Sequence, residues 1–314
     1  MLEINAGELY KLFRNKIHTA FLTASAVIFL LCTATKLSAA EIVVVKSSAL
    51  KPYNDALEGF KSTCLCTVRE LNLAESGQLK RQILESKPAA VLAIGVDALN
   101  SLGNLDGPPL FYTMVSEMTP ELAAKTKHLS GTRIDLMPET YLNTMRKLFP
   151  KAGRIGIIFS NRNTGAFVKA VQDISYSNGF EIIAKEVTTP REVPNIIEGL
   201  REKIDMFWML PDSGVITTET VEAIFLFSFK NKVPVFSFAN KYVKMGAIAS
   251  ISADPFNLGA QTGEIVAKKL DHKDFHNHVH KRAQKTLLFL NSNIAGKMGV
   301  VFKADIIRQA EEVY

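Results

Sequence analysis

The chain has 314 residues, of which 47% are hydrophobic and 22% are charged, and its formal net charge is +6. This composition is that of a globular protein, it excludes a disordered chain, and the length allows two domains. Lysines and arginines are scattered among many carboxylates, so the positive charge does not indicate a nucleic-acid-binding protein.

The first 40 residues have the order of a secretory signal. Basic residues between 11 and 16 precede a short apolar run, Ala20 to Cys32, and Ser38-Ala39-Ala40 follows as a small-residue cleavage site. The apolar run is too short and too interrupted by hydroxyl residues for a comfortable membrane-spanning helix. We expect export to the periplasm and cleavage after residue 40, with an uncleaved anchor as the alternative.

Only two cysteines follow residue 40, Cys64 and Cys66. One residue separates them, which is tight for a disulfide, and a zinc site would need more ligands nearby. We interpret them first as two small buried residues beside a strand. A strained redox-active pair and a bridge to another chain stay open as alternatives.

Strands and helices alternate from Glu41 onward. Short apolar runs bounded by turn residues predict buried parallel strands, with amphipathic helices between them. The first series of predicted strands is Ile42–Val45, Thr67–Leu73, Ala89–Ile94 and Leu110–Met114. The second series is Arg154–Phe159, Glu181–Val187, Met206–Leu210 and Val233–Phe238, and a helix over Asn257–Leu270 follows. This order predicts parallel sheets with helices on both faces, an α/β fold.

The two series resemble each other. Ile42 to Ser47 and Ile155 to Ser160 each run as a strand, a serine and then a helix. We therefore predict two similar lobes whose facing strand ends make one cleft, because ligands of open α/β sheets lie beyond the carboxyl ends of the strands. The predicted parts are a signal peptide over 1–40, an N-terminal lobe over 41–133 completed by a C-terminal crossover near 255–285, a C-terminal lobe over 134–254, and a crossing segment and tail over 286–314.

Catalytic motifs are absent from the sequence. It contains no P-loop, no G-x-S-x-G elbow and no G-x-G-x-x-G after a strand, and no histidine accompanies the serines and aspartates at strand ends. We therefore expect a binding protein without a cofactor rather than an enzyme.

The residues at the strand ends suit ligand binding. Helix N-termini offer free N–H groups and positive potential, and hydroxyls and amides supplement them for a carboxylate or another polar head group. Each such residue alone is also an ordinary helix cap, so the prediction rests on their convergence at one cleft. Asp212 and Asp254 are predicted to neutralise an ammonium group. The predicted ligand-binding residues are Ser47, Ser48, Gly95, Val96, Asp97, Ser116, Asn161, Thr164, Asp212 and Asp254.

Three histidines alternate near the C-terminus. An extended segment would place His276, His278 and His280 on one face, where imidazoles bind zinc, copper or nickel. The surrounding charged residues favour a solvated loop, and a metal site is the alternative.

The second half of the chain resembles the ABC transporter substrate-binding proteins of the tryptophan/tyrosine type. The matching segments are Met137–Tyr141, Leu148–Ile157, Pro211–Ser213, Val233–Phe236, Gly246–Ser250 and Asn291–Gly299, and the resemblance is weaker over residues 41–130. It implies a type I periplasmic-binding fold, with two Rossmann-like lobes, three crossing strands and hinge closure on a ligand such as an amino acid. Val96 stands where the family has a threonine, which removes a hydroxyl.

These observations together predict a solute receptor for an ABC importer. The implied partners are a small polar solute and a permease in the inner membrane, and the chain is expected to be a monomer. The alternatives are a periplasmic sensory module for a membrane sensor and a metal-handling protein that uses the histidine run.

Overall fold

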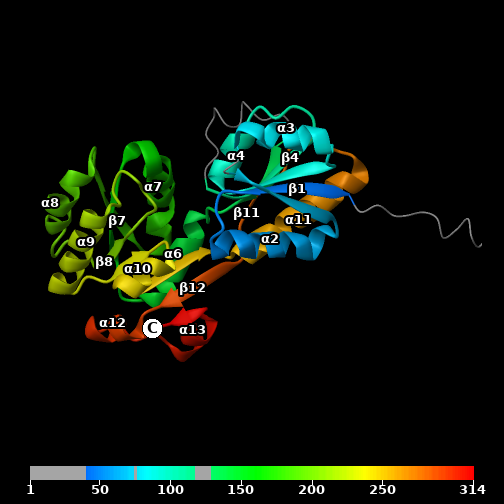
Figure 1. Ribbon diagram of the computed structural model, residues 1–314. Helices are drawn as coiled ribbons and strands as arrows, with labels where there is room; N and C mark the ends of the chain where they lie inside the picture. The colour runs from blue at the N-terminus through cyan, green and yellow to red at the C-terminus, as the bar shows by residue number, and fades with distance from the viewer. Residues whose placement is uncertain (1–39, 74–75, 117–128) are drawn as a thin grey trace, which may run out of the picture. The chain divides into compact units, whose positions relative to one another are not determined.

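The structure is a computed structural model that describes residues 40–73, 76–116 and 129–314. The predicted signal segment lies outside these residues. The first of two sheets has six strands, all parallel, in the order β11-β5-β4-β3-β1-β2 (Figure 1). Its strands are β1 (Glu41–Lys46), β2 (Thr67–Asn72), β3 (Ala90–Ile94), β4 (Leu110–Val115), β5 (Leu129–Arg133) and β11 (His280–Arg282).

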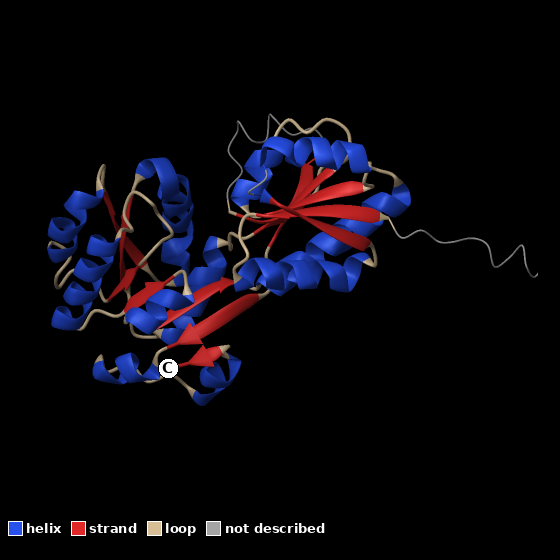
Figure 2. Cartoon of the chain, in the orientation of Figure 1, coloured by secondary structure: helices blue, strands red, loops and turns tan. Residues whose placement is uncertain are grey.

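Helices cover both faces of this sheet (Figure 2). The helices are α2 (Lys51–Cys64) and α11 (Pro255–His272) on one face and α3 (Ser76–Ser86) and α4 (Val96–Leu102) on the other. Strand β1 shows why two apolar faces result, because successive side chains point to opposite sides of a strand. Ile42 and Val44 belong to the core with α2 and α11, and Val43 and Val45 belong to the core with α3 and α4.

Helices α2 and α11 run parallel to each other at very short range. A Cβ atom at Gly59 would lie 1.9 Å from the backbone oxygen of Phe256, and one at Gly259 would lie 1.8 Å from that of Ala56. Further along, Gly263 approaches Thr63, whose hydroxyl donates to the backbone oxygen of Ala260 at 2.7 Å. The glycines are therefore required by this close approach of two backbones.

The second sheet has seven strands in the order β13-β12-β10-β9-β8-β6-β7. Its neighbouring strands are parallel except β10 and β12, which are antiparallel. The strands are β6 (Arg154–Phe159), β7 (Glu181–Glu186), β8 (Met206–Trp208), β9 (Val235–Ser237), β10 (Ala249–Ala253), β12 (Thr286–Leu290) and β13 (Glu312–Val313).

Two buried clusters flank the second sheet. One packs against α6 (Pro138–Leu148), α7 (Asn161–Ser175), α12 (Ser292–Lys297) and α13 (Ala304–Gln309). The other packs against α8 (Val193–Glu198), α9 (Thr218–Asn231) and α10 (Asn240–Met245). Short 3-10 turns lie at Tyr176–Asn178 and Pro190–Glu192. Trp208 is fully buried in the first cluster, with ring centroids 5.1 Å from Tyr141 and 5.7 Å from Phe167.

The chain passes between the two sheets three times. The connections are β5 to α6, β10 to α11 and β11 to β12. Asp135 ties the first connection to the third, since its carboxylate pairs with Arg133 at 2.6 Å and with Arg282 at 2.9 Å. The prediction of an α/β fold with parallel-rich sheets is therefore confirmed. The crossings differ from the three strands that were expected, since two of them lead from a strand to a helix.

The cysteines differ from the interpretation favoured by the sequence. Cys64 and Cys66 form a disulfide, with Cα atoms 5.3 Å apart. Leu65 between them adopts the left-handed conformation, with φ of 52°, and this turn is what brings the flanking residues within disulfide range. Cys64 is buried as expected, but as half of a bridge.

Within the described residues, no helix has both the length and the hydropathy needed to cross a membrane.

Candidate functional site

At the carboxyl edge of the first sheet, four predicted site residues lie close to Gly95, a fifth predicted residue. They are Ser47, Ser48, Val96 and Asp97. Gly95 follows β3 with a φ of +96°, and a Cβ there would lie 2.5 Å from the hydroxyl oxygen of Ser47 and 2.6 Å from the ring of Tyr53. Ser47 follows β1, and its hydroxyl accepts a hydrogen bond from the backbone N–H of Ala98 at 2.9 Å. The turn thus needs glycine both for its dihedral angle and for its space.

Val96 and Asp97 form the first turn of α4 directly after Gly95. Among the described residues, nothing accepts a hydrogen bond from the backbone N–H of either one. The Val96 side chain is 43% exposed, and Asp97 is exposed as well. This edge therefore has two backbone donors without an acceptor in the described part of the chain, and their use by a ligand stays a prediction.

Tyr53 belongs to the same edge, although the sequence analysis did not select it. It lies in the first turn of α2, half-buried against Gly95, and its hydroxyl has no hydrogen-bond partner among the residues described. Only its position a few residues after the Ser47-Ser48 pair could have indicated its role. The Ser48 hydroxyl is engaged locally, since it accepts from the Leu50 N–H at 3.2 Å.

The end of β4 carries an irregular backbone. The register with β5 shifts between Tyr112 and Val115, and Met114 between them has a φ of 60°. Non-glycine residues in this conformation cluster at functional sites, where surrounding packing holds them. Ser116 follows this irregular turn and is exposed.

At the carboxyl edge of the second sheet, Asp212 organises its neighbours. The residue is 1% exposed. One carboxylate oxygen accepts from the Ser160 backbone N–H at 2.7 Å and the Thr164 hydroxyl at 2.5 Å. The other accepts from the Ser160 hydroxyl at 2.8 Å, the Asn163 amide at 2.9 Å and the Gly214 N–H at 2.8 Å. Asp212 thus joins the end of β6, the start of α7 and its own loop.

The electrostatics of Asp212 follow from these contacts. Burial by itself would raise the pKa of its carboxyl, but hydrogen bonds from Thr164, Ser160 and Asn163 outweigh burial and hold the pKa below its ordinary value. The carboxylate is ionised and surrounded by the protein's own donors. Its contribution in this state is to fix the edge, and the neutralisation of a ligand ammonium stays a prediction.

The remaining site residues of the second sheet differ in accessibility. Asn161 is exposed at the first position of α7, whereas Thr164 is buried and donates to Asp212. Asp254 follows β10 and caps α11, because its side chain accepts from the Asn257 N–H at 3.2 Å. Asn161 is therefore the residue of this set most open to a ligand.

The histidine run does not assemble a metal centre in the described part of the chain, where no group of three or more histidine, cysteine, aspartate or glutamate side chains could hold a metal ion. His278 and His280 do lie on one face, with stacked rings 6.3 Å apart. Each Nδ1 has a protein partner, however. That of His280 lies 3.0 Å from the Tyr112 hydroxyl, and that of His278 lies 3.1 Å from the backbone oxygen of Leu129.

Comparison with known proteins gives one family for most of the chain. Residues 71–314 match the family model described as ABC transporter substrate binding protein. A tyrosine-binding protein of Clostridioides difficile (strain R20291) is 27% identical over 172 residues, which are 52% of this chain and 49% of that relative. The match thus spans about half of the relative's length.

Solved structures show the same fold at low identity. The ligand-free, open structure of a substrate-binding protein with adhesive properties from Clostridium difficile has a TM-score of 0.73 at 20% identity, covering 87% of this chain and 99% of that one. A domain from Streptococcus pneumonia in complex with L-Trp has a TM-score of 0.60 at 16% identity, covering 88% and 100%. The type I periplasmic-binding architecture predicted from the sequence is therefore confirmed.

Proposed function

This chain belongs to the ABC transporter substrate-binding protein family, and from that premise we propose that it binds a free amino acid and delivers it to an importer. The family consists of transport receptors and not of enzymes. Relatives with this fold include a tyrosine-binding protein and a domain in complex with L-Trp, so aromatic amino acids are the first ligands to test.

The observation that carries the proposal is the carboxyl edge of the first sheet. The backbone N–H groups of Val96 and Asp97 and the hydroxyl of Tyr53 have no acceptor or partner among the described residues. Backbone donors at a helix start suit a carboxylate, and an aromatic ring beside them suits an apolar side chain. In this proposal Ser47, Ser48, Gly95 and Ser116 complete the first half of the site.

The second half of the proposed site is the edge that Asp212 organises. Asn161 would contact the ligand, and Thr164 and Asp212 would hold Asn161 and the start of α7 in place. Asp254 would set the position of the crossing from β10 to α11. Ligand contacts to both edges would favour a closed state, since a ligand stabilises the conformation that it binds best.

The proposed setting is the periplasm, reached through the signal at residues 1–40. There the monomeric protein would present its closed form to a permease in the inner membrane. No cofactor takes part in this cycle.

A thermal-shift panel tests the proposal. The purified protein is melted with each amino acid, and with nucleosides, sugars and small carboxylates as comparison classes. A ligand at a hundredfold over its dissociation constant adds about 2.7 kcal/mol of stability, which corresponds to a rise in Tm of roughly 4–5 °C for a chain of this size. A panel in which only sugars or nucleosides raise the Tm would contradict the amino-acid assignment.

A further inference from the structure

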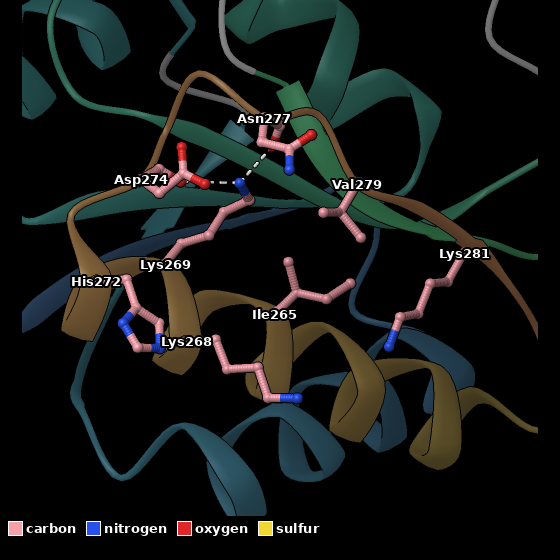
Figure 3. A pocket seen from close by; sticks show the side chains of 8 residues that line it. All are labelled: Ile265, Lys268, Lys269, His272, Asp274, Asn277, Val279 and Lys281. Carbon is pink, nitrogen blue, oxygen red and sulfur yellow. Dashed lines mark hydrogen bonds between the residues drawn. The ribbon is translucent and has the colours of Figure 1, made fainter.

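A basic pocket lies near the amino edge of the first sheet, at the opposite end of the strands from the residues around Gly95. It has a volume of about 300 Å³ and lies between the last two turns of α11, the loop after it and β11 (Figure 3). This volume is at the small end of the range for small-molecule sites.

The position of the pocket follows from the packing of α11 on α2. Helix α2 begins after the carboxyl end of β1 and ends before the start of β2, so it runs from the carboxyl edge of the sheet to the amino edge. Since α11 runs parallel to α2, its last residue, His272, lies at the amino edge. The pocket is therefore distinct from the carboxyl edge that carries Gly95.

Basic residues dominate the lining of this pocket. Lys268, Lys269 and His272 come from α11, Lys281 comes from β11, and Asp274 is the one acid among the lining residues. Lys268 and Lys281 pair with no carboxylate in the described part of the chain. In Figure 3 their side chains extend toward the same part of the pocket, on either side of Ile265.

Lys269 holds the loop that forms one side of the pocket. The residue is 7% exposed, and its ammonium donates to the backbone oxygens of Asp274, at 2.9 Å, and of Asn277. These bonds hold the loop after α11 against the helix, as the dashed lines in Figure 3 show. The loop and Lys281 are thereby placed before any ligand arrives.

The helix dipole explains only part of this charge. Cations in the last turn of a helix offset the partial negative charge of its C-terminus, which accounts for the α11 residues. It does not account for Lys281, a half-buried lysine on a separate strand that faces the same concavity without an acidic partner. An uncompensated, partly buried ammonium in a preformed concavity is a setting that an anion stabilises.

We infer that this pocket binds a phosphate group, with Lys268 and Lys281 as its main contacts. A phosphate dianion in the pocket would be attracted by both ammonium groups, and Ile265 and Val279 are the apolar residues of the lining. The same chemistry is offered by free inorganic phosphate and by the head group of an anionic lipid. The inference is independent of the amino-acid site.

Two binding measurements distinguish the sources. The first is a phosphorus NMR titration of the protein with inorganic phosphate at low ionic strength. The second is sedimentation with vesicles of phosphatidylglycerol, with phosphatidylcholine vesicles for comparison. The variant is Lys268→Gln with Lys281→Gln, which keeps the apolar stems and leaves Lys269 in place.

The control removes the same charge elsewhere. Lys147→Gln with Lys169→Gln changes two exposed lysines on α6 and α7. We expect the pocket variant to weaken binding by about tenfold or more, because charge-assisted hydrogen bonds are among the strongest in proteins. The control variant should bind like the original protein, and the amino-acid ligand should bind equally well to all three.

Each outcome decides the inference. Phosphate binding that only the pocket variant loses supports a site for free phosphate, and vesicle binding with the same pattern supports a lipid head group. If neither probe binds, or if the pocket and control variants lose binding equally, the inference is wrong.

Discussion

Replacing Asp212 by asparagine tests whether this residue organises the edge of the second sheet. The amide has the same shape but exchanges one accepting oxygen for an NH₂ group. In one orientation that group meets the Ser160 N–H and the Thr164 hydroxyl, and in the other it meets the Gly214 N–H and two further donors. The first orientation leaves the buried Ser160 N–H without an acceptor, and the second leaves the partly buried Gly214 N–H without one.

The cost follows from these contacts. Hydrogen bonds to a charged group contribute about 1.5–3 kcal/mol, and a buried donor left unpaired adds a penalty of about 1–3 kcal/mol. We expect Asp212→Asn to lower the free energy of unfolding by about 3 kcal/mol, and Tm by roughly 5 °C. Asp173→Asn, an exposed aspartate on α7, is the matched control and should change stability by less than about 0.5 kcal/mol.

The assay is urea unfolding followed by tryptophan emission. Trp208 is the only tryptophan in the sequence and is fully buried, close along the chain to Asp212. Its emission therefore reports the unfolding of the half that Asp212 stabilises. A loss no larger than that of the Asp173 control would show that the hydrogen bonds of Asp212 contribute little and would refute the reasoning.

Three further expectations concern the glycine turn, a histidine and the disulfide. Gly95→Ala should lower the free energy of unfolding by about 1–3 kcal/mol, because φ is +96° and the site is crowded. Gly296→Ala, with open space around the residue, should change it little. Equal urea midpoints for the two variants would contradict this expectation. Partial burial, with the positive charges of His278 and Arg133, lowers the pKa of His280, so folded protein binds its proton less readily than unfolded protein does. The free energy of unfolding should therefore fall as the pH drops through 6.5 toward the lower pKa of the folded state, and the His280→Gln variant should lose less of it over that window. If the original protein and the variant lose the same amount between these pH values in urea unfolding, His280 does not have this role. Reducing the Cys64–Cys66 bridge should cost only about 1–2 kcal/mol, since the closed ring is so short. Alkylation without a reductant should leave the mass of a chain that begins at Glu41 unchanged, because such a chain has no other cysteine.

The buried central strands were predictable because they are apolar runs, whereas β5, β10 and β12 were not among the predicted strands. Ile42 to Val45 lies between two layers of helices, so every position is apolar and the run marks a buried parallel strand. Short strands carry no such pattern. Strand β11 has the residues His280-Lys281-Arg282, and only its pairing with β5 makes it a strand.

The candidate site was predictable in position and less so in detail. Strand ends followed by serine, glycine or asparagine mark the carboxyl edges of both sheets. The sequence did not predict the hydrogen bonds that Asp212 accepts from Ser160, Asn163 and Thr164, because these residues lie about fifty positions away along the chain. Tyr53 was missed for the same reason, since its place against Gly95 depends on the pairing of β1 with β3.

Calorimetric titration of L-tyrosine and L-tryptophan tests the central claim most directly, when it compares the protein with one variant at each edge. Val96→Glu places a negative charge at an exposed helix start, which does not destabilise a helix but repels a carboxylate. Asn161→Ala removes the exposed amide at the other edge. Gln172→Glu, exposed further along α7, is the control for charge. We predict that one ligand binds per chain, that both edge variants weaken binding by at least about tenfold, and that the control variant binds normally. Binding that neither edge variant weakens, or no binding of any amino acid, would contradict the account.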